Sequence, residues 1–377
     1  MKEGWIVKKL GEVCVSDLGK TLNQSKDKGD LHNYLCAINV LWDKIELTTL
    51  KQAKFEDDEL ERYSVYKGDL LVCEGGDIGR AAIWDKDETI LYQNALHRVR
   101  FGKELMARFC LLYLKYLKQT NILDTKYGKG VTIKHLVKSS LLSIPIPVPP
   151  LEEQTQIVDE LDQLSNIIEK QRQQLSELDN LAQSIFYDMF GDPVTNEKGW
   201  ELKKLKDVST LLNGRAYKQN ELFDEGRYKV LRVGNFFTNN TYYYSDLELE
   251  PDKYCDNGDL LFAWSASFGA FIWDGEKVIY HYHIWKVLFD DSYLDKIFYQ
   301  YLLNTMTRSF MKDVHGIGMV HLTKIGMEQY MLPLPPLSLQ QLFAQKIEAI
   351  EQEKEIIKQS IAETEELFNS RMDYYFG

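Results

Sequence analysis

The chain has 377 residues, of which 44% are hydrophobic and 12% aromatic. This length and composition suit two or three folded domains and exclude a disordered protein. Its five cysteines are scattered without any C-x-x-C spacing, which argues against a disulfide framework or a zinc site and favours a reducing cytoplasm. The start MKEGWIVKKL lacks the apolar segment of a signal peptide, and no run of apolar residues is long enough to span a membrane. We therefore expect a soluble, cytoplasmic protein.

The net charge of -12 argues against a polyanionic partner until its distribution along the chain is considered. Residues 1–150 carry 23 basic and 20 acidic side chains, and residues 199–336 carry 15 and 18. The acidic excess lies in residues 151–198, with 3 basic against 11 acidic, and in residues 337–377, with 4 against 8. The two larger segments are near neutral and leave room for local basic surfaces.

The sequence consists of two copies of one unit. GWIVKKLGEV (4–13) matches GWELKKLKDV (199–208), and KGDLLVCEGGDIGRAAIWD (67–85) matches NGDLLFAWSASFGAFIWD (257–274). YGKGVTIKHL (127–136) pairs loosely with HGIGMVHL (315–322), and SIFYDMFG (184–191) lies opposite SRMDYYFG (370–377). Each copy therefore comprises a globular part, a proline-rich junction and a long helical segment.

The globular parts are rich in strand-like runs separated by Gly-Asp or glycine-rich turns. In the first copy these runs are 34–40, 69–73, 81–85 and 90–101, and in the second 228–233, 259–264, 270–274 and 278–289. One helix-like stretch follows in each copy, at 104–119 and 295–311. The pattern predicts an α+β fold with a mixed, mostly antiparallel sheet in each copy.

The junctions read IPIPVPPLEEQ (144–154) and LPLPPLSLQQ (332–341). Proline is excluded from a helix interior, so these residues set where each following helix starts. At the second junction Ser338 and Gln341 have the spacing of a capping box, and at the first Glu152 and Glu153 favour the positive end of a helix dipole. The offset between the copies shrinks from 195 to 186 within the globular parts, whereas the helical segments match in length. Helix length is thus the constrained dimension.

The helical segments show a period of 3.5 residues, typical of a coiled coil. In the first, the seam contains Ile157, Leu161, Leu164, Ile168, Gln171, Leu175, Leu178, Ala182 and Ile185. In the second, Lys354, Thr364 and Arg371 interrupt the equivalent seam. Forty helical residues span roughly 60 Å. Two such amphipathic segments of matched length are expected to pair with each other.

The usual signatures of catalysis are absent from the sequence. There is no Walker A loop, H-E-x-x-H, G-x-S-x-G or zinc-finger spacing, and no F-x-G-x-G or D/N-P-P-Y/F motif of DNA methyltransferases. GGDIGRA (75–81) lacks the spacing of a dinucleotide loop and favours a tight turn. His281 and His283 would face the same side of a strand, but no third ligand with metal-site spacing accompanies them. We expect no catalytic residue, no cofactor and no metal, with these histidines facing DNA or half-buried.

The two junctions, PIPVPPLEEQTQI and PLPPLSLQQLFAQKI, resemble the start of the helical regions in specificity (S) subunits of type I restriction-modification systems. The resemblance covers the whole chain, because the G-W-x-x-K-K-L openings, the G-D-L-L segments, the loop before His-Leu, the junctions and the long helices all occur twice in the same order. One such motif would be weak evidence, whereas the repeated order is strong.

The resemblance implies a target-recognition domain in residues 1–150 and a second in 192–336, each reading one half of a bipartite, asymmetric DNA site. It implies that the helical regions 151–191 and 337–377 pack antiparallel, separate the two recognition domains and set the spacer. Two methyltransferase (M) subunits would dock on these helices, and restriction (R) subunits would join that complex. The chain itself would then be non-catalytic.

Residues that contact DNA are expected on protruding loops: Lys and Arg for phosphates, and Arg, Asn, Gln, Ser, Thr or aromatic side chains for bases. In the first domain these criteria select Arg80, Gln93, Asn94, Lys126, Lys129, Thr132 and Lys134. In the second they select Arg215, Tyr217, Arg232, Trp264, Ser265, His281, His283, His315 and Lys324. The glycines at 128–130 and 316–318 either bring bare backbone close to phosphate or form plain turns. Tyrosines 242–244 either stack on bases or, as we favour, belong to a half-buried strand.

Two other classes of protein remain in view. A coiled-coil adaptor with two protein-binding heads would share the architecture without reading DNA. A stand-alone DNA methyltransferase or nuclease is disfavoured by the missing motifs.

Overall fold

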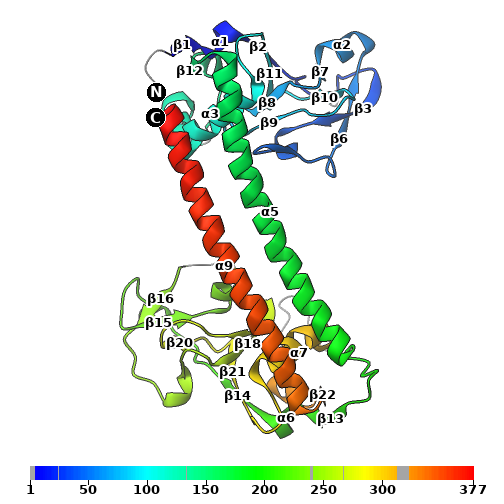
Figure 1. The fold of residues 1–377 in the computed structure, drawn as a ribbon, viewed down its shortest axis with the longest axis vertical. Coiled ribbons are helices and arrows are strands. Elements are labelled where there is room, and N and C mark those ends of the chain that lie inside the picture. Colours follow the sequence, from blue (N-terminus) through cyan, green and yellow to red (C-terminus); the bar gives the residue numbers. More distant parts are fainter. Residues whose placement is uncertain (1–4, 24, 133, 238–240, 266, 312–321) are drawn as a thin grey trace. The chain divides into compact units, whose positions relative to one another are not determined.

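The computed structural model describes residues 5–377 apart from 24, 133, 238–240, 266 and 312–321. The chain forms two compact units, residues 1–172 with 359–377, and residues 173–358 (Figure 1). Each unit contains one globular part together with one end of each long helix. His315 and glycines 316 and 318, which the sequence singled out, lie outside the described residues.

The first unit contains two four-stranded sheets. The antiparallel sheet has the order β2-β11-β8-β9, formed by Cys14–Leu18, Leu96–Phe101, Leu70–Cys73 and Ala81–Ile83. The other has the order β6-β3-β10-β7, formed by Lys51–Phe55, Asp30–Leu35, Ile90–Tyr92 and Ser64–Val65, and its strands β3 and β10 are parallel. Two short pairs complete the strands: β1 (Ile6–Lys9) with β12 (Pro145–Val148), and β4 (Val40–Leu41) with β5 (Lys44–Ile45). The helices and turns are α1 Leu10–Val13, η1 Ala37–Asn39, α2 Asp57–Arg62, α3 Ala107–Gln119, η2 Leu123–Tyr127 and α4 Lys138–Leu142.

The second unit repeats this topology. Its antiparallel sheet β14-β21-β18-β19 consists of Ser209–Asn213, Ile284–Phe289, Leu260–Ser265 and Ser267–Ile272. Its mixed sheet β16-β15-β20-β17 consists of Tyr243–Ser245, Tyr228–Leu231, Val278–Tyr280 and Tyr254–Cys255, again with one parallel pair. Strand β13 (Glu201–Lys204) pairs with β22 (Met331–Leu334), and the helices and turns are α6 Leu205–Val208, η3 Gln219–Glu221, η4 Val233–Phe236, η5 Pro251–Lys253, α7 Lys296–Phe310 and α8 Lys324–Glu328. The predicted α+β class, the mostly antiparallel sheets and the internal duplication are confirmed.

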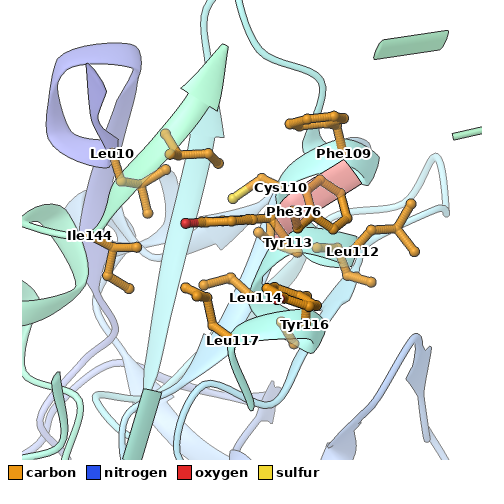
Figure 2. Packing of buried hydrophobic residues seen from close by; sticks show 14 of the residues in the cluster. Leu10, Phe109, Cys110, Leu112, Tyr113, Leu114, Tyr116, Leu117, Ile144 and Phe376 are labelled. Carbon is orange, nitrogen blue, oxygen red and sulfur yellow. The ribbon is translucent and has the colours of Figure 1, made fainter. Parts of the chain in front are cut away.

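Helix α3 lies in the core of the first unit because it is apolar on nearly every face. Its residues Phe109, Tyr113 and Tyr116 surround Phe376, the aromatic residue at the end of the chain's last helix (Figure 2). The second unit is built in the same way, because Phe190 packs against Phe298 of α7 with ring centroids 4.7 Å apart. Each long helix therefore ends as part of a core.

The predicted long helices are α5 (Leu151–Phe190) and α9 (Leu337–Phe376), each of 40 residues. In the first unit, Glu160 and Gln171 of α5 contact Arg371 and Ser360 of α9. Since positions later in α5 meet positions earlier in α9, the two helices pair antiparallel, as the coiled-coil pattern and the family resemblance predict. In the second unit, residues of both helices again share one hydrophobic core.

The charged residues that interrupt the seam of α9 are neutralised by partners. Arg371 and Tyr375 both donate to Glu160, the tyrosine at 2.5 Å. The ammonium of Lys354 lies 2.8 Å from Asp179 and 2.8 Å from Glu351. A charge at a seam position is tolerated when it is paired, and such pairs favour one register over others.

Each proline junction is held by one buried glutamine. The side chain of Gln154 donates to the carbonyls of Glu104 and Pro149 and accepts from the backbone N–H of Met106, at 2.8 to 2.9 Å. Gln340 makes the equivalent three bonds, to Tyr293, Pro335 and Asp295. This explains why both junctions carry glutamine, at positions 186 residues apart.

The prediction of a capping box at the second junction is wrong. Helix α9 starts at Leu337, so Ser338 already lies inside it and cannot act as its N-cap. Gln340, one residue before the predicted Gln341, is the glutamine that the junction uses. At the first junction, Glu152 and Glu153 do occupy the first turn of α5, as expected.

Candidate nucleic-acid interface

Four chain segments meet at one edge of the antiparallel sheet in the first unit. After β2, the carbonyl of Lys20 accepts from the backbone of Asn94 at 3.0 Å, in the turn between β10 and β11. After β8, Glu74 donates to the carbonyl of Ala95 at 3.0 Å, and its own carbonyl accepts from Leu136 at 2.7 Å. We call this meeting of residues 19–21, 74–76, 93–95, 129–132 and 135–136 the first loop edge.

The second unit has the same backbone bonding at the equivalent place. The carbonyl of Arg215 accepts from Tyr282 at 3.1 Å, and the backbone of Trp264 donates to His283 at 3.1 Å and accepts from Leu322 at 3.3 Å. We call residues 213–217, 264–265, 281–283 and 322–324 the second loop edge. The two loop edges share their hydrogen-bonding frame, whereas the side chains at several equivalent positions differ, as at Glu74 and Trp264.

A glycine at the end of the first strand allows this frame in both copies. A Cβ atom on Gly19 would lie 2.4 Å from the carbonyl oxygen of Tyr92, and one on Gly214 would lie 2.3 Å from that of Tyr280. These distances exclude any side chain at either position without movement of the backbone. The two glycines therefore fix how closely the strand end approaches the neighbouring turn.

The first loop edge brings together four of the seven residues predicted for the first domain. Gln93 and Asn94 form its central turn, and the Asn94 amide donates to Thr21 at 3.2 Å. Lys129 and His135 exchange backbone hydrogen bonds of 2.8 and 2.7 Å, and the exposed Thr132 lies in the loop between them. Polar, exposed side chains on a fixed backbone are what base and phosphate contacts require.

The other three predicted residues of the first domain have intramolecular roles. The Arg80 guanidinium donates to the carbonyl of Ala37 at 2.7 Å. Lys134 donates to the carbonyl of Asp124 at 2.6 Å, and the Lys126 ammonium lies 5.6 Å from the ring centre of Tyr127. Their charges help to hold η1 and η2 in place. Sequence alone could not show this, because the partner carbonyls of Arg80 and Lys134 lie 43 and 10 residues away.

The second loop edge collects most of its predicted residues. Arg215 makes two bonds of 2.8 Å with Glu221, and this pair lowers the pKa of the Glu221 carboxyl to about 2. The ring of Tyr217 stacks on His281 with centroids 6.4 Å apart. The guanidinium of Arg215 is therefore held in one orientation by its two bonds to the Glu221 carboxylate.

The two histidines of this edge have ring centroids 4.8 Å apart. Burial, the neighbouring His283 and Arg232 together lower the pKa of His281 to about 4, so its ring is neutral at pH 7 and can accept or donate a hydrogen bond. The Arg232 side chain also lies over the ring of Tyr243, which belongs to strand β16. Within the described ranges, no group of three His, Cys, Asp or Glu residues has the arrangement of a metal site.

An aromatic pocket of about 370 Å³ opens at the second loop edge. The indole rings of Trp264 and Trp285 are stacked, with centroids 5.4 Å apart, and Trp264 donates to the carbonyl of Tyr282 at 2.9 Å. The buried Nε1 of Trp285 has no hydrogen-bond partner in the described part of the chain. The pocket is completed by Asn213, His283, Leu322, Thr323 and Lys324. Ser265 is buried, in contrast to the exposed loop position expected of a base contact.

Sequence reasoning missed several residues of the two edges, namely Glu74, Asn213, Tyr282 and Trp285. Glu74 carried a signal, because the alignment of the two G-D-L-L segments places it opposite Trp264. Asn213 and Trp285 are 72 positions apart in sequence, and the pairing of β14 with β21 brings them together. The burial of Trp285 depends on the same pairing. A single sequence does not reveal that pairing.

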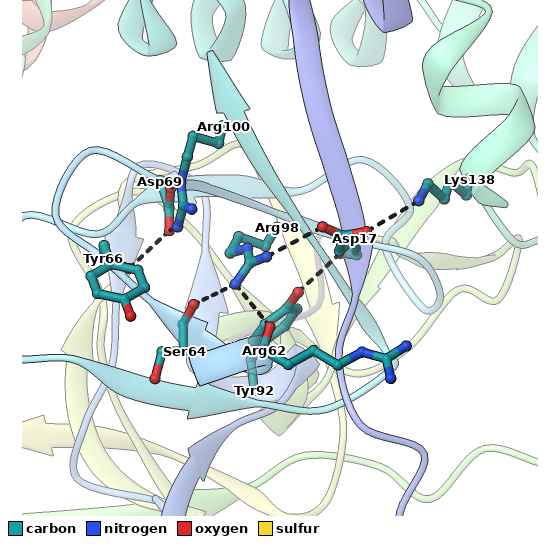
Figure 3. A network of polar contacts seen from close by, with 9 residues as sticks. All are labelled: Asp17, Arg62, Ser64, Tyr66, Asp69, Tyr92, Arg98, Arg100 and Lys138. Carbon is teal, nitrogen blue, oxygen red and sulfur yellow. Dashed lines mark hydrogen bonds and ion pairs between the residues drawn. The ribbon is translucent and has the colours of Figure 1, made fainter. Parts of the chain in front are cut away.

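A cluster of arginines in the first unit looks basic in sequence but is largely neutralised (Figure 3). Arg98 donates to the carbonyls of Arg62 and Ser64 and pairs with Asp17 at 3.3 Å. Arg100 makes two 2.7 Å bonds with the buried Asp69. Because Arg98 lies on β11 and Ser64 on β7, these bonds tie the two sheets together. We assign the cluster to the fold.

Duplicated sheet units with a common backbone frame and unlike loop side chains, linked to paired long helices, define a class of DNA-specificity proteins. The family described as "Type I restriction modification DNA specificity domain" matches residues 2–179 and again 197–366. The chain belongs to this family and carries two copies of its domain.

Individual relatives agree with this assignment. The chain is 24% identical to a putative type I restriction enzyme MjaX specificity subunit of Methanocaldococcus jannaschii, over 93% of this chain and 87% of that protein. It shares its fold with a structure from a study of complex assembly and conformational transition of the type I R-M system, at a TM-score of 0.64 and 18% identity, covering 100% and 98% of the two chains. It also shares its fold with the type I restriction-modification S subunit of M. genitalium, at a TM-score of 0.55 and 13% identity, covering 98% and 95%. No helix in the described part of the chain has the length and apolar character needed to cross a membrane.

Proposed function

We propose that this chain is the DNA sequence-specificity subunit of a type I restriction-modification complex, and that each loop edge reads one half of a bipartite, asymmetric DNA site. The main support for this proposal is that the two loop edges share one backbone frame and differ in side chains at equivalent positions. A pair of readers for two unlike half-sites needs a constant frame to position the loops and variable side chains to contact the bases.

The proposed division of labour follows the duplication. Residues 1–150 and 192–336 act as the two target-recognition domains, and residues 151–191 and 337–377 form the paired helices that separate them and set the spacer. Two M subunits dock on these helices, and R subunits join through the M/S complex. The equal lengths of α5 and α9 support this proposal, because a spacer of fixed length requires helices of fixed length.

We propose DNA contacts for the residues selected from the sequence apart from Arg80, Lys126 and Lys134, whose side chains contact the fold, and Ser265, which is buried. Among them, Lys129, Arg215 and Lys324 would contact phosphates, since they carry positive charge at the loop edges. Gln93, Asn94, His281 and His283 would contact base edges. The chain would act in the cytoplasm without a catalytic residue, a cofactor or a metal of its own, and the M and R subunits would perform the chemistry.

The decisive test is a methylome. The chain is co-expressed with its cognate M subunits in a host that lacks DNA adenine methylation, and the genomic DNA is sequenced for modified bases. We expect a single new adenine-methylated motif with two unlike half-sites separated by a spacer of fixed length.

A matched culture with the M subunits but without this chain should show no such motif. If the chain were instead a coiled-coil adaptor without DNA specificity, it would bind its partners and yet leave the methylome unchanged. Absence of a motif in the presence of an assembled M/S complex would contradict the proposed function.

A further inference from the structure

Because the two recognition domains are copies of one unit, residues at equivalent positions in them can be compared directly. At the first loop edge Glu74 follows strand β8, and at the second Trp264 lies at the corresponding place on β18. Both residues donate through the backbone to the turn before the next strand and accept from a leucine, Leu136 or Leu322. The backbone therefore places these two side chains identically within their own units.

The fold does not use the side chain of Glu74. Glu74 is half-buried, and its carboxylate makes no hydrogen bond or ion pair within the described residues, although His135 interacts with it electrostatically. Burial raises the pKa of this carboxyl, and the nearby His135 opposes that rise. The carboxylate oxygens of Glu74 are not among the buried polar atoms that lack a partner, so the carboxylate reaches solvent at this edge and can accept a hydrogen bond from a donor outside the chain.

The space beside Glu74 is open to such a donor. The next two residues are glycines, and a Cβ atom on Gly76 would meet no atom within 4 Å. Gly76 has a φ of 74°, which glycine adopts readily and other residues rarely do. A planar base edge can therefore approach the carboxylate from the side of Gly76, whereas the ring of His135 lies next to Gly75.

The chemistry of a carboxylate restricts what it can recognise. An ionised carboxylate only accepts hydrogen bonds, and it is repelled by phosphates. In the major groove, the exocyclic amino groups of cytosine and adenine are the available donors, and acidic side chains typically accept from the N4 amino group of cytosine.

Trp264, unlike Glu74, offers no free hydrogen-bond acceptor to a base. Its single donor is already bonded to Tyr282, and one ring face is stacked on Trp285. What it offers at the edge of the aromatic pocket is apolar ring surface. In the major groove the matching apolar group is the 5-methyl of thymine.

We propose that Glu74 and Trp264 set the base preference at equivalent positions of the two half-sites. Glu74 accepts a hydrogen bond from the exocyclic amino group of a base in one half-site, and Trp264 contacts a thymine methyl in the other. This inference rests on the proposed function, because it names the groups that the two readers recognise.

The test compares methylomes of complexes assembled from the full chain and its cognate M subunits. For the variant Glu74→Gln we expect the preference at one base pair of one half-site to fall roughly tenfold or more, since an amide no longer selects for a donor alone. The other half-site and the spacer stay unchanged. Trp264→Gln should alter one position of the other half-site, whereas Trp264→Phe should keep the preference for thymine.

The matched control is Glu88→Gln, which makes the same chemical change at an exposed site of the same unit, away from the loop edge. Its motif should equal that of the wild type. If Glu74→Gln weakens assembly of the complex, Glu74→Asp tests the same point. Aspartate keeps a carboxylate on a shorter side chain, so the preference for a base with an amino group should remain while a smaller fraction of the sites is methylated.

The outcomes separate the two proposals. A wild-type motif that Glu74→Gln and Glu74→Asp leave unaltered in sequence and occupancy overturns the inference and leaves the proposed function standing. A change of base preference at several positions, or in both half-sites, also overturns it, because a base contact acts at one position. No motif from the wild-type complex overturns both.

Discussion

At the scale of single residues, the polar side chains that matter most to this fold are Gln154 and Gln340. Each is fully buried at a proline junction and satisfies three backbone groups. Proline lacks an N–H and cannot continue a helix backwards, so the carbonyls around a junction need a side-chain donor. The two glutamines supply it and join the start of each long helix to the loop before α3 or α7.

Replacing Gln154 by alanine should destabilise the first unit by about 3 kcal/mol, because two carbonyls and one N–H lose their buried partner. The measurement is chemical denaturation of the full chain, with amide exchange at Met106 as a local probe. Gln156→Ala is the matched control: it removes the same side chain from an exposed position two residues along the same helix and should change the free energy of unfolding by less than about 0.5 kcal/mol. Equal effects of the two substitutions would contradict this role for Gln154.

At the scale of elements, each long helix ends in an aromatic residue that belongs to a core. Phe376 is buried among Phe109, Tyr113 and Tyr116 of α3 (Figure 2). Phe190 packs on Phe298 and Phe343. The final residues of the chain are thus part of the first unit, although they are 250 or more positions from α3 in sequence. Burial of aromatic surface contributes strongly to core stability.

Phe376→Ala should therefore lower the stability of the first unit by roughly 3–5 kcal/mol, the usual range for a large aromatic residue removed from a core. Calorimetry of the full chain gives the change in melting temperature, and hydrogen exchange of α3 shows where the loss occurs. Tyr374→Ala, at an exposed position two residues earlier, should leave the exchange of α3 at its wild-type rate. Unaltered protection of α3 in Phe376→Ala would rule out the packing role.

At the scale of the whole molecule, the proposed spacer depends on the paired helices, whose register within the first unit is fixed by polar contacts inside the seam. The pairs Gln171–Ser360 and Glu160–Arg371 have residue numbers with the same total, so the helices run in register without a stutter between them. Because each helix rises 1.5 Å per residue, the distance along the helix axis between two such contacts is set by the number of residues between them.

If the helices set the spacer, one added heptad in each should lengthen it. Insertions after Leu175 and after Glu355 lie opposite each other in this register and preserve the 3.5-residue period. They add about 10 Å, which corresponds to about three base pairs of B-DNA. The methylome of the double-insertion variant should show both half-sites intact and a longer spacer.

A heptad inserted in α5 alone breaks the register and should abolish the motif, which makes it a useful comparison. An unchanged spacer in the double-insertion variant would show that the helices do not measure the site.

The sequence predicted the fold more completely than it predicted the residues of the loop edges. The two long helices and the duplication follow from local periodicity and self-similarity, and the structure confirms them. The strand runs predicted at 90–101 and 278–289 each form two strands that belong to different sheets, and residues 37–39 of the run at 34–40 form a turn. The loop edges were predicted in part: Gln93, Asn94, Lys129 and the histidines do lie there, whereas Arg80 and Lys134 bind carbonyls of the fold. A charged loop residue looks the same in sequence whether its partner is a carbonyl or a phosphate.

The sequence by itself determined the duplication, the positions of the junctions and the length of the helices, because repeats, prolines and a 3.5-residue period are local properties of a chain. Only the tertiary structure decided which side chains remain available at each loop edge. Glu74 lies there beside His135 with no hydrogen bond or ion pair to any described residue, and Trp264 lies there stacked on Trp285, because strands and loops from four distant segments meet around them. The position of these four segments depends on long-range packing, which a local sequence pattern does not reveal.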